Sequence, residues 1–215
     1  MKRFWLSILL IIIQLTFALW VSSFLEADAK IPSHWNFRGE VDGYSGKWVG
    51  LFLFAGINIL VLLLMVFMPH YSPRYKNAPQ KFNEIIPRLT NILILFFALI
   101  HIYTLAISAG FLQMNINFIL YLMGIMFIMI GNILPKLPSN FFAGIKVPWT
   151  LTSEENWQKT HKFAGYTFSF AGLLMIIIPI IWQNKPNVFP VVFYLMLFFT
   201  LCPILYSFIL FKNQR

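Results

Sequence analysis

Charged residues are scarce in this 215-residue chain, at 11% against 59% hydrophobic residues. A soluble domain usually carries charge at about a quarter of its positions, so this composition excludes an ordinary soluble protein. Proline, glycine and serine nowhere gather into a linker, and the chain therefore reads as one domain over residues 1–215. The single cysteine, Cys202, excludes an intramolecular disulfide.

Six apolar stretches contain no Lys, Arg, Asp or Glu at all. A membrane-spanning helix needs about 20 apolar residues, because its backbone must satisfy its own hydrogen bonds in lipid. We therefore predict an all-α fold, a polytopic membrane bundle of six transmembrane helices. The predicted spans are residues 4–25, 49–68, 90–110, 116–134, 163–182 and 188–211.

The basic residues fall unevenly between alternate loops. Lysine and arginine near helix ends are retained in the cytoplasm, so the richer set of loops indicates the inner side. With both ends of the chain inside, the cytoplasmic set is Lys2, Arg3, Arg74, Lys76, Lys81, Arg88, Lys136, Lys146, Lys159, Lys162, Lys212 and Arg215. The outer set is Lys30, Arg38, Lys47 and Lys185. We predict an N-in, C-in orientation.

The first span also resembles a signal peptide, because Lys2 and Arg3 precede it and Ala27-Asp28-Ala29 follows it. Its apolar stretch is longer than the usual signal core, so we expect an uncleaved anchor. The net charge is +9, and the basic residues that produce it are scattered in short runs between apolar segments. That scatter favours membrane lipid as the partner of the basic residues and argues against direct binding of nucleic acid.

The first outer loop, residues 26–48, is polar and rich in turn formers. Pro32 favours an extended Ile31, while Gly39 and Gly43 are able to take positive φ, so a compact cap on the outer surface is predicted. The candidate ligand-binding residues of this cap are His34, Trp35, Asn36, Glu40 and Asp42.

Two other readings of this loop stay open. His34, Glu40 and Asp42 are competent in metal binding or acid/base chemistry, but their spacing matches no zinc pattern, and we predict no metal and no cofactor. Alternatively, Asp42 caps a helix that begins near Ser45, while His34 and Glu40 bond the loop backbone. Trp35 and Tyr44 suit the headgroup level of the membrane.

The second inner loop, residues 135–162, is aromatic and basic. Thr152 and Glu155 have capping-box spacing, which predicts a short helix that carries Trp157 and His161 on one face. Trp149 and Trp157 are predicted to anchor this element at the membrane interface. The residues singled out in this loop are Asn140, Gly144, Lys146, Pro148, Trp149, Thr150, Trp157, Thr160 and His161.

Enzymatic alternatives are weakly supported. Glu154, Glu155 and His161 form a conceivable catalytic set, yet no nucleophile motif or phosphate-binding loop accompanies them, and no catalytic residue is predicted. Within the membrane, His101 suggests a small transporter, although a histidine bonded across a helix interface is commoner. Gln14, Asn58, Asn117 and Asn132 are expected to contribute to the same interior. The glycine pairs predicted to allow close helix approach are Gly124 with Gly131 and Gly165 with Gly172.

Both long loops resemble signatures of the SdpI family. The outer stretch Ile31-Pro32-Ser33-His34-Trp35-Asn36, followed by Gly39-Glu40-Val41-Asp42, is similar to the domain of unknown function at the N-terminus of this family. The inner stretch from Asn140 to Leu151, continuing to Trp157 and His161, is similar to its C-terminal signature. Lys146 stands where arginine is expected.

The resemblance implies a multi-pass protein of the bacterial plasma membrane, not an enzyme, that confers immunity to a secreted peptide toxin. It also implies signalling, in which a cytoplasmic transcriptional repressor is held at the membrane. In this scheme the outer loop recognises the toxin, and the inner loop relays the signal or anchors the repressor.

Overall fold

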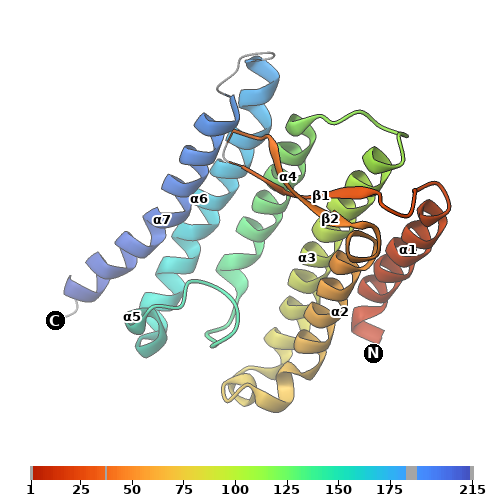
Figure 1. Cartoon of the computed structure of the whole chain (residues 1–215). Coiled ribbons are helices and arrows are strands. Elements are labelled where there is room, and N and C mark those ends of the chain that lie inside the picture. Colours follow the sequence, from red (N-terminus) through yellow and green to blue (C-terminus); the bar gives the residue numbers. More distant parts are fainter. Residues whose placement is uncertain (1, 37, 183–187, 214–215) are drawn as a thin grey trace.

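Six long helices dominate the computed structural model, which describes residues 2–36, 38–182 and 188–213 (Figure 1). Each is long and apolar enough to cross a membrane, which confirms the predicted multi-pass fold. They are α1 (Trp5–Ser22), α2 (Lys47–Tyr71), α3 (Pro79–Ser108), α4 (Ile116–Ile133), α6 (Glu154–Ile181) and α7 (Val188–Asn213). Of the predicted basic residues, Lys185 and Arg215 lie outside the described residues.

Six short elements lie outside the long helices. Strands β1 (Lys30–Trp35) and β2 (Val41–Gly46) pair antiparallel between α1 and α2, at the opposite end of the bundle from α5 (Pro148–Thr152). Single 3-10 turns are η1 (Lys2–Phe4), η2 (Tyr75–Asn77) and η3 (Leu134–Lys136). The sequence predicted a compact turn structure before α2 but not these strands.

Two of the helices begin well before the predicted membrane spans. α3 begins at Pro79 instead of near residue 90, and α6 runs without a break from Glu154, so it includes both the short helix predicted near Thr152 and the span predicted from residue 163. Apolarity marks only the part of a helix that lies in hydrocarbon, whereas the polar first turns are stabilised by side chains, as in the Glu84–Arg88 pair at 2.9 Å.

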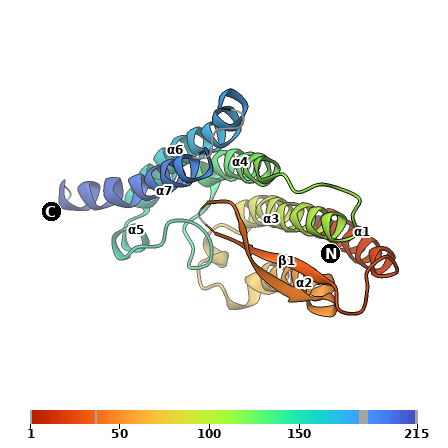
Figure 2. The same cartoon turned by 45° about the horizontal axis from the view of Figure 1, so that its top comes forward.

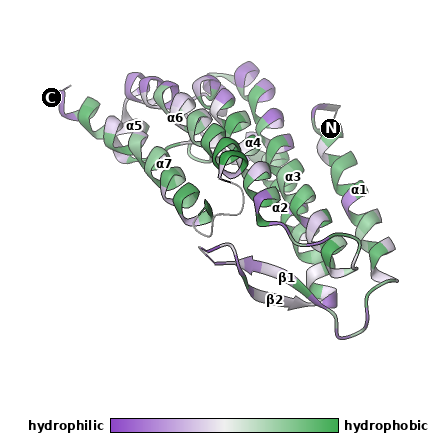
Figure 3. Ribbon diagram, turned by 90° about the horizontal axis from the view of Figure 1, so that it is seen from above, coloured by the Kyte–Doolittle hydropathy of each residue, from purple (hydrophilic) through white to green (hydrophobic). Residues whose placement is uncertain are grey.

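The surface of the bundle is apolar along its middle. Hydrophobic residues cover the central lengths of the helices in Figure 3, and hydrophilic residues gather near their ends. Large aliphatic side chains such as Leu60, Ile181 and Leu205 are more than half exposed. This distribution suits lipid as the surrounding solvent.

The helices form two groups that meet along α3 and α4. α3 packs against α1 and α2, while α6 packs against α4 and α7. The tightest approach is between α4 and α6, where a Cβ on Gly172 would lie 2.4 Å from the carbonyl oxygen of Gly124. A Cβ on Gly131 would lie 2.8 Å from the carbonyl oxygen of Gly165. The predicted glycine positions thus all serve close contact, paired across the two helices.

Polar side chains occupy the centre of the α1–α2–α3 group. Gln14 donates to Nδ1 of His101 at 2.9 Å, and Nε2 of His101 donates to the Gly50 carbonyl at 3.0 Å. Asn58 donates to the Gln14 side chain at 2.8 Å. All three side chains are fully buried. The prediction that Gln14 and Asn58 share the interior with His101 is confirmed, but Asn132 is exposed and binds Lys136 instead.

The hairpin bridges the two helix groups at its end of the bundle (Figure 2). Ile31 is 2% exposed and lies in a cluster with Val21, Leu51 and Leu105 of the first group. At the hairpin tip, a Cβ on Gly39 would lie 2.7 Å from Ile116 of α4 and 3.2 Å from Phe189 of α7. The hairpin is therefore anchored in one group and touches the other.

The two polar loops lie at opposite ends of the bundle, and we predict that they face opposite sides of the membrane. In a Cys202→Ser background, Glu26→Cys should react with a membrane-impermeant maleimide on protoplasts, whereas Lys76→Cys should react only after permeabilisation. Both positions are exposed and remote from the bundle core. Labelling of both before permeabilisation would contradict the six-span arrangement, and reversed labelling would contradict the N-in orientation.

Candidate functional site

The hairpin tip is organised by one asparagine side chain. Oδ1 of Asn36 accepts hydrogen bonds from the backbone N–H of Arg38 at 2.8 Å and of Glu40 at 3.1 Å. Its amide nitrogen donates to the Glu40 carboxylate at 2.9 Å. Gly39 closes the turn at φ 81°, a conformation that favours glycine. Asn36 and Glu40 thus have structural partners within the tip itself.

His34 and Asp42 pair across the two strands. Nδ1 of His34 lies 2.5 Å from Oδ1 of Asp42, and both side chains are exposed, at 69% and 43%. Gly43 makes room for the histidine, since a Cβ there would lie 2.9 Å from that of His34. Gly43 is not among the positive-φ glycines, so only the Gly39 half of that prediction is confirmed.

The expectation that Asp42 caps a helix is wrong. α2 is capped by Gly46, without any side-chain hydrogen bond, and Asp42 is engaged by His34. The two strands place Asp42 and His34 next to each other on the same face of the hairpin, so Asp42 bonds His34 instead of the first turn of α2. Glu40 pairs with Arg38 at 3.3 Å, and within the described residues no three His, Cys, Asp or Glu side chains group around a common point.

Trp35 leaves a polar atom without a partner. Its indole Nε1 is buried, and no hydrogen-bond acceptor reaches it among the residues that the structure describes. A buried N–H without an acceptor costs on the order of 1–3 kcal/mol. The His34–Asp42 pair and the exposed Tyr44 ring, by contrast, give the hairpin an outward face with ionisable groups and aromatic area.

The inner loop is folded onto α6 by its own motif residues. Asn140 accepts from the backbone N–H groups of Phe142 at 2.8 Å and Ala143 at 2.7 Å. Thr150 is fully buried and bonds the backbone of both Ile145 and Val147. The predicted motif is therefore a compact turn closed by side chains that bond to backbone groups.

His161 is held by the backbone through both ring nitrogens. Nδ1 donates to the Trp157 carbonyl at 2.8 Å, and Nε2 accepts from the Ile145 N–H at 3.0 Å. Gly144 lies directly over the ring at φ 104°, and a Cβ there would lie 2.3 Å from Nε2. The catalytic set with Glu154 and Glu155 is not assembled, because Glu154 bonds Gln158 and Glu155 bonds Lys159.

Trp157 is a core residue. Its side chain is 0% exposed, its ring stacks on His161 at 3.9 Å between centroids, and its indole donates to the Leu137 carbonyl at 2.9 Å. The shared face with His161 was predicted correctly, but the role of Trp157 as a membrane-interface anchor is wrong. Spacing alone did not show that residues 134–147 fold back over this face of α6.

The start of α6 differs by one residue from the predicted capping box. Ser153, and not Thr152, is the N-cap, and its hydroxyl accepts from the Asn156 N–H at 3.2 Å. Thr152 ends α5, whose first residue is Pro148, and bonds the Pro148 carbonyl at 3.0 Å. Thr152 and Ser153 are both good N-cap residues, and because Thr152 belongs to α5, Ser153 becomes the N-cap of α6.

Trp149 and Asn156 connect the inner loop and the start of α6 to α7. The Trp149 indole donates to the Ser207 hydroxyl at 2.7 Å, and Asn156 donates to the Ser207 carbonyl at 3.0 Å. Thr160 in turn donates to the Asn156 side chain at 3.0 Å. Ser207 and Asn156 were missed by the sequence reasoning, although both are small polar residues with no obvious role in an apolar helix or helix start.

Arg74 joins the inner loop to the α2–α3 turn and was also missed. Its guanidinium donates to the Ser139 hydroxyl and, at 2.6 Å, to the Leu151 carbonyl, and it lies 4.5 Å from the ring centre of Phe141. Arg74 belongs to the α2–α3 turn and bonds two positions of the inner loop, so it bridges the two helix groups. The motif residues left facing outward are Phe141, Phe142 and Lys146.

Comparisons with known proteins agree with these two segments. Residues 136–209 match the SdpI/YfhL protein family, and residues 11–59 match a domain of unknown function, DUF1648. The immunity protein SdpI of Bacillus subtilis (strain 168) is 27% identical over 121 residues, which are 56% of this chain and 58% of that protein. The match thus spans little more than half the length of this relative. No solved structure matches the chain.

The Gly144–His161 contact predicts a strong effect of one methyl group. Gly144→Ala should lower the thermal unfolding midpoint of the purified protein, because it combines positive-φ strain of about 1–3 kcal/mol with a clash against a fixed ring. Gly46→Ala is the matched control, since nothing lies within 4 Å of the added Cβ and its φ is −66°. Equal midpoints for the two variants would contradict this account of the motif.

Proposed function

Because the chain is a relative of the SdpI/YfhL protein family, we propose that it is a bacterial membrane immunity protein that protects the cell against a secreted peptide toxin. The named relative is an immunity protein, and the six apolar helices suit the same membrane location. The supporting feature in this chain is the hairpin, a polar element set on the end of the bundle opposite to the termini.

We assign recognition of the toxin to the outward face of the hairpin. The exposed His34–Asp42 pair offers an imidazole and a carboxylate to an approaching peptide backbone or side chain, next to Trp35, whose indole N–H is buried and unpartnered. Asn36 and Glu40 act in this proposal by holding the tip rather than by touching the ligand. The two rival functions are less well supported by the contacts of their key residues.

A transporter would use His101 to carry a proton or a substrate. Both nitrogens of this ring are hydrogen-bonded, to Gln14 and to the Gly50 carbonyl, in a fully buried setting. An enzyme would use His34 or His161 with a carboxylate, yet His161 is bound to backbone on both sides. The hairpin face is the surface whose groups remain available to an external partner.

Asp42→Ala should weaken immunity without weakening the fold. Expressed in a Bacillus subtilis strain without its own SdpI, the wild-type chain should restore growth in the presence of the toxin that this immunity protein counters. Asp42→Ala should lower the tolerated toxin concentration by about tenfold, while the loss of an exposed ion pair costs only about 0–1 kcal/mol of stability. Glu26→Ala, which removes an exposed carboxylate ahead of the hairpin, should behave as wild type.

Two results would contradict this assignment. Wild-type protein that reaches the membrane and gives no protection would refute the immunity proposal itself. Full protection by both Asp42→Ala and Trp35→Ala, at normal membrane levels measured by immunoblot, would refute recognition by the hairpin.

We further propose that the inner loop holds a cytoplasmic transcriptional repressor at the membrane when toxin is bound. The turn that carries Phe141, Phe142 and Lys146 faces outward at the α5 end and combines aromatic area with positive charge. The hairpin and this turn each touch both helix groups, so a ligand that favours one arrangement of the groups is felt at both ends.

Lys146→Glu should release the repressor while immunity is kept. A fluorescently tagged transcriptional repressor encoded beside the gene of this protein should sediment with wild-type membranes after toxin addition and remain soluble with Lys146→Glu membranes. Lys212→Glu, at the end of α7 on the same side of the bundle, is the control and should retain the repressor. Equal sedimentation with wild-type membranes before and after toxin addition would overturn the relay.

A further inference from the structure

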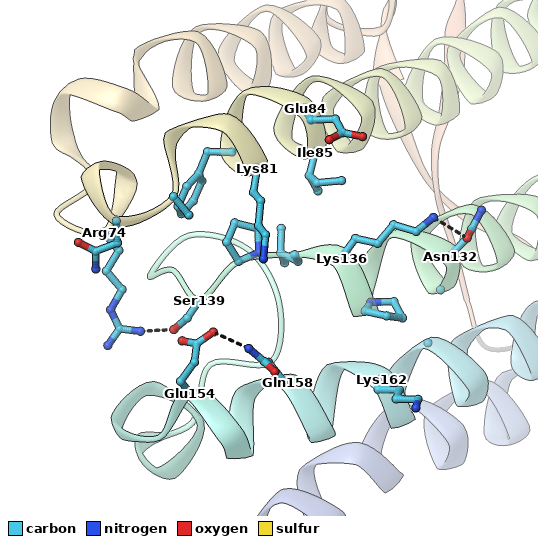
Figure 4. Close-up of a pocket in the computed structure, with 18 of the residues that line it drawn as sticks. Arg74, Lys81, Glu84, Ile85, Asn132, Lys136, Ser139, Glu154, Gln158 and Lys162 are labelled. Carbon is cyan, nitrogen blue, oxygen red and sulfur yellow. Dashed lines mark hydrogen bonds between the residues drawn. The ribbon is translucent and has the colours of Figure 1, made fainter.

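A cleft of about 1340 Å³ opens between α3, α4 and α6 near the α5 end of the bundle (Figure 4). Pockets for small molecules usually measure roughly 300–1,000 Å³, so this space is too large for a single inorganic anion. Neither the hairpin face nor the exposed Phe141–Lys146 turn lies in it.

Positive charge predominates along the cleft. Arg74, Lys81, Lys136 and Lys162 line it, against the carboxylates Glu84 and Glu154. Glu84 is already paired with Arg88 at 2.9 Å, and Glu154 accepts from Gln158. None of the ion pairs found in the described parts of the chain involves the three lysines, and Figure 4 shows Lys81 pointing into the space between α3 and α6. The cleft therefore attracts an anion.

The cleft also extends to membrane depth. Its walls continue from Lys136 up α4 to Ile128 and from Lys162 up α6 to Ser169. Residues 128–133 of α4 and the 3-10 turn η3 together correspond to a rise of about 13 Å, so these walls reach well into the hydrocarbon layer if Lys136 marks the headgroup level. A soluble anion would not contact the part of the cleft that lies at hydrocarbon depth. A lipid has a charged headgroup and an apolar tail, so it can contact both parts.

A second, apolar pocket of about 380 Å³ adjoins the cleft. The two share Ile85, Asn132 and Lys136, and the second is otherwise lined largely by aliphatic side chains such as Leu10 and Leu95. Arg88 also lines this pocket, with its charge paired to Glu84. Lys136 thus lies where a basic headgroup site meets an apolar groove.

We infer that the cleft binds one anionic glycerophospholipid from the leaflet on the α5 side. Its phosphate is held by Lys81, Lys136 and Lys162, and an acyl chain follows α4 into the adjoining groove. Basic pockets between transmembrane helices are a known way to select anionic headgroups. This site is separate in space from the toxin face, which lies at the opposite end of the bundle.

The experiment is native mass spectrometry of the detergent-purified full chain, titrated with phosphatidylglycerol or phosphatidylcholine. Wild-type protein should retain phosphatidylglycerol at an about tenfold lower lipid concentration than phosphatidylcholine. Lys81→Gln/Lys162→Gln should abolish most of that preference, as expected for the loss of two basic contacts. Lys76→Gln/Lys212→Gln removes the same charge from the same end outside the cleft and should keep the preference.

Three outcomes would overturn the site. The first is equal retention of the two lipids by the wild-type chain. The second is an equal loss in the control variant, which would reduce the effect to general charge. The third is displacement of phosphatidylglycerol by excess inorganic phosphate, which would assign the cleft to a soluble anion. Thermal unfolding confirms that the variants are folded, and Lys136→Gln replaces the double variant if that one is not.

Discussion

Lipid around the helices removes water as a hydrogen-bond partner, and most of this structure follows from that constraint. Backbone groups in the hydrocarbon must bond within their own helix, so irregular segments are confined to the two ends of the bundle. The hairpin and the residue 134–153 segment satisfy their backbone internally, through Asn36, Asn140, Thr150 and His161. Their defining side chains are thereby committed to shape, and few remain to meet a partner.

The same constraint explains how the two helix groups are held together. Apolar faces give little preference for one helix neighbour over another in lipid, so close backbone approach and polar contacts decide the arrangement. Between α4 and α6 the glycines provide close approach. Between the groups the contacts are concentrated at the ends, where Gly39 meets Ile116 and Phe189, and where Arg74 bonds Ser139 and Leu151.

Apolarity predicted the six helices because the hydrocarbon thickness sets their minimum length. It says nothing of their polar extensions, so the start of α3 was placed too late, whereas the capping-box spacing placed the start of α6 within one residue. Local motifs predicted the tight turn at Gly39 and the shared face of Trp157 and His161. What sequence did not reveal were contacts between distant segments. The burial of Trp157 and the bridges from Arg74 and Ser207 depend on which loop lies over which helix. The His34–Asp42 pair depends on the pairing of the two strands of the hairpin, which was not predicted either.

The division into two groups has a consequence for any signal that crosses this protein. A ligand shifts an equilibrium only by the difference of its affinity for two states, so both ends must sense one shared rearrangement. The α4–α6 contact is locked by glycines at van der Waals distance, whereas the line between α3 and α6 contains the basic cleft. Relative movement of the groups would therefore change the width of the cleft first. A lipid bound there would favour the arrangement it fits, and toxin at the hairpin and lipid in the cleft would then be thermodynamically coupled, each altering the affinity for the other.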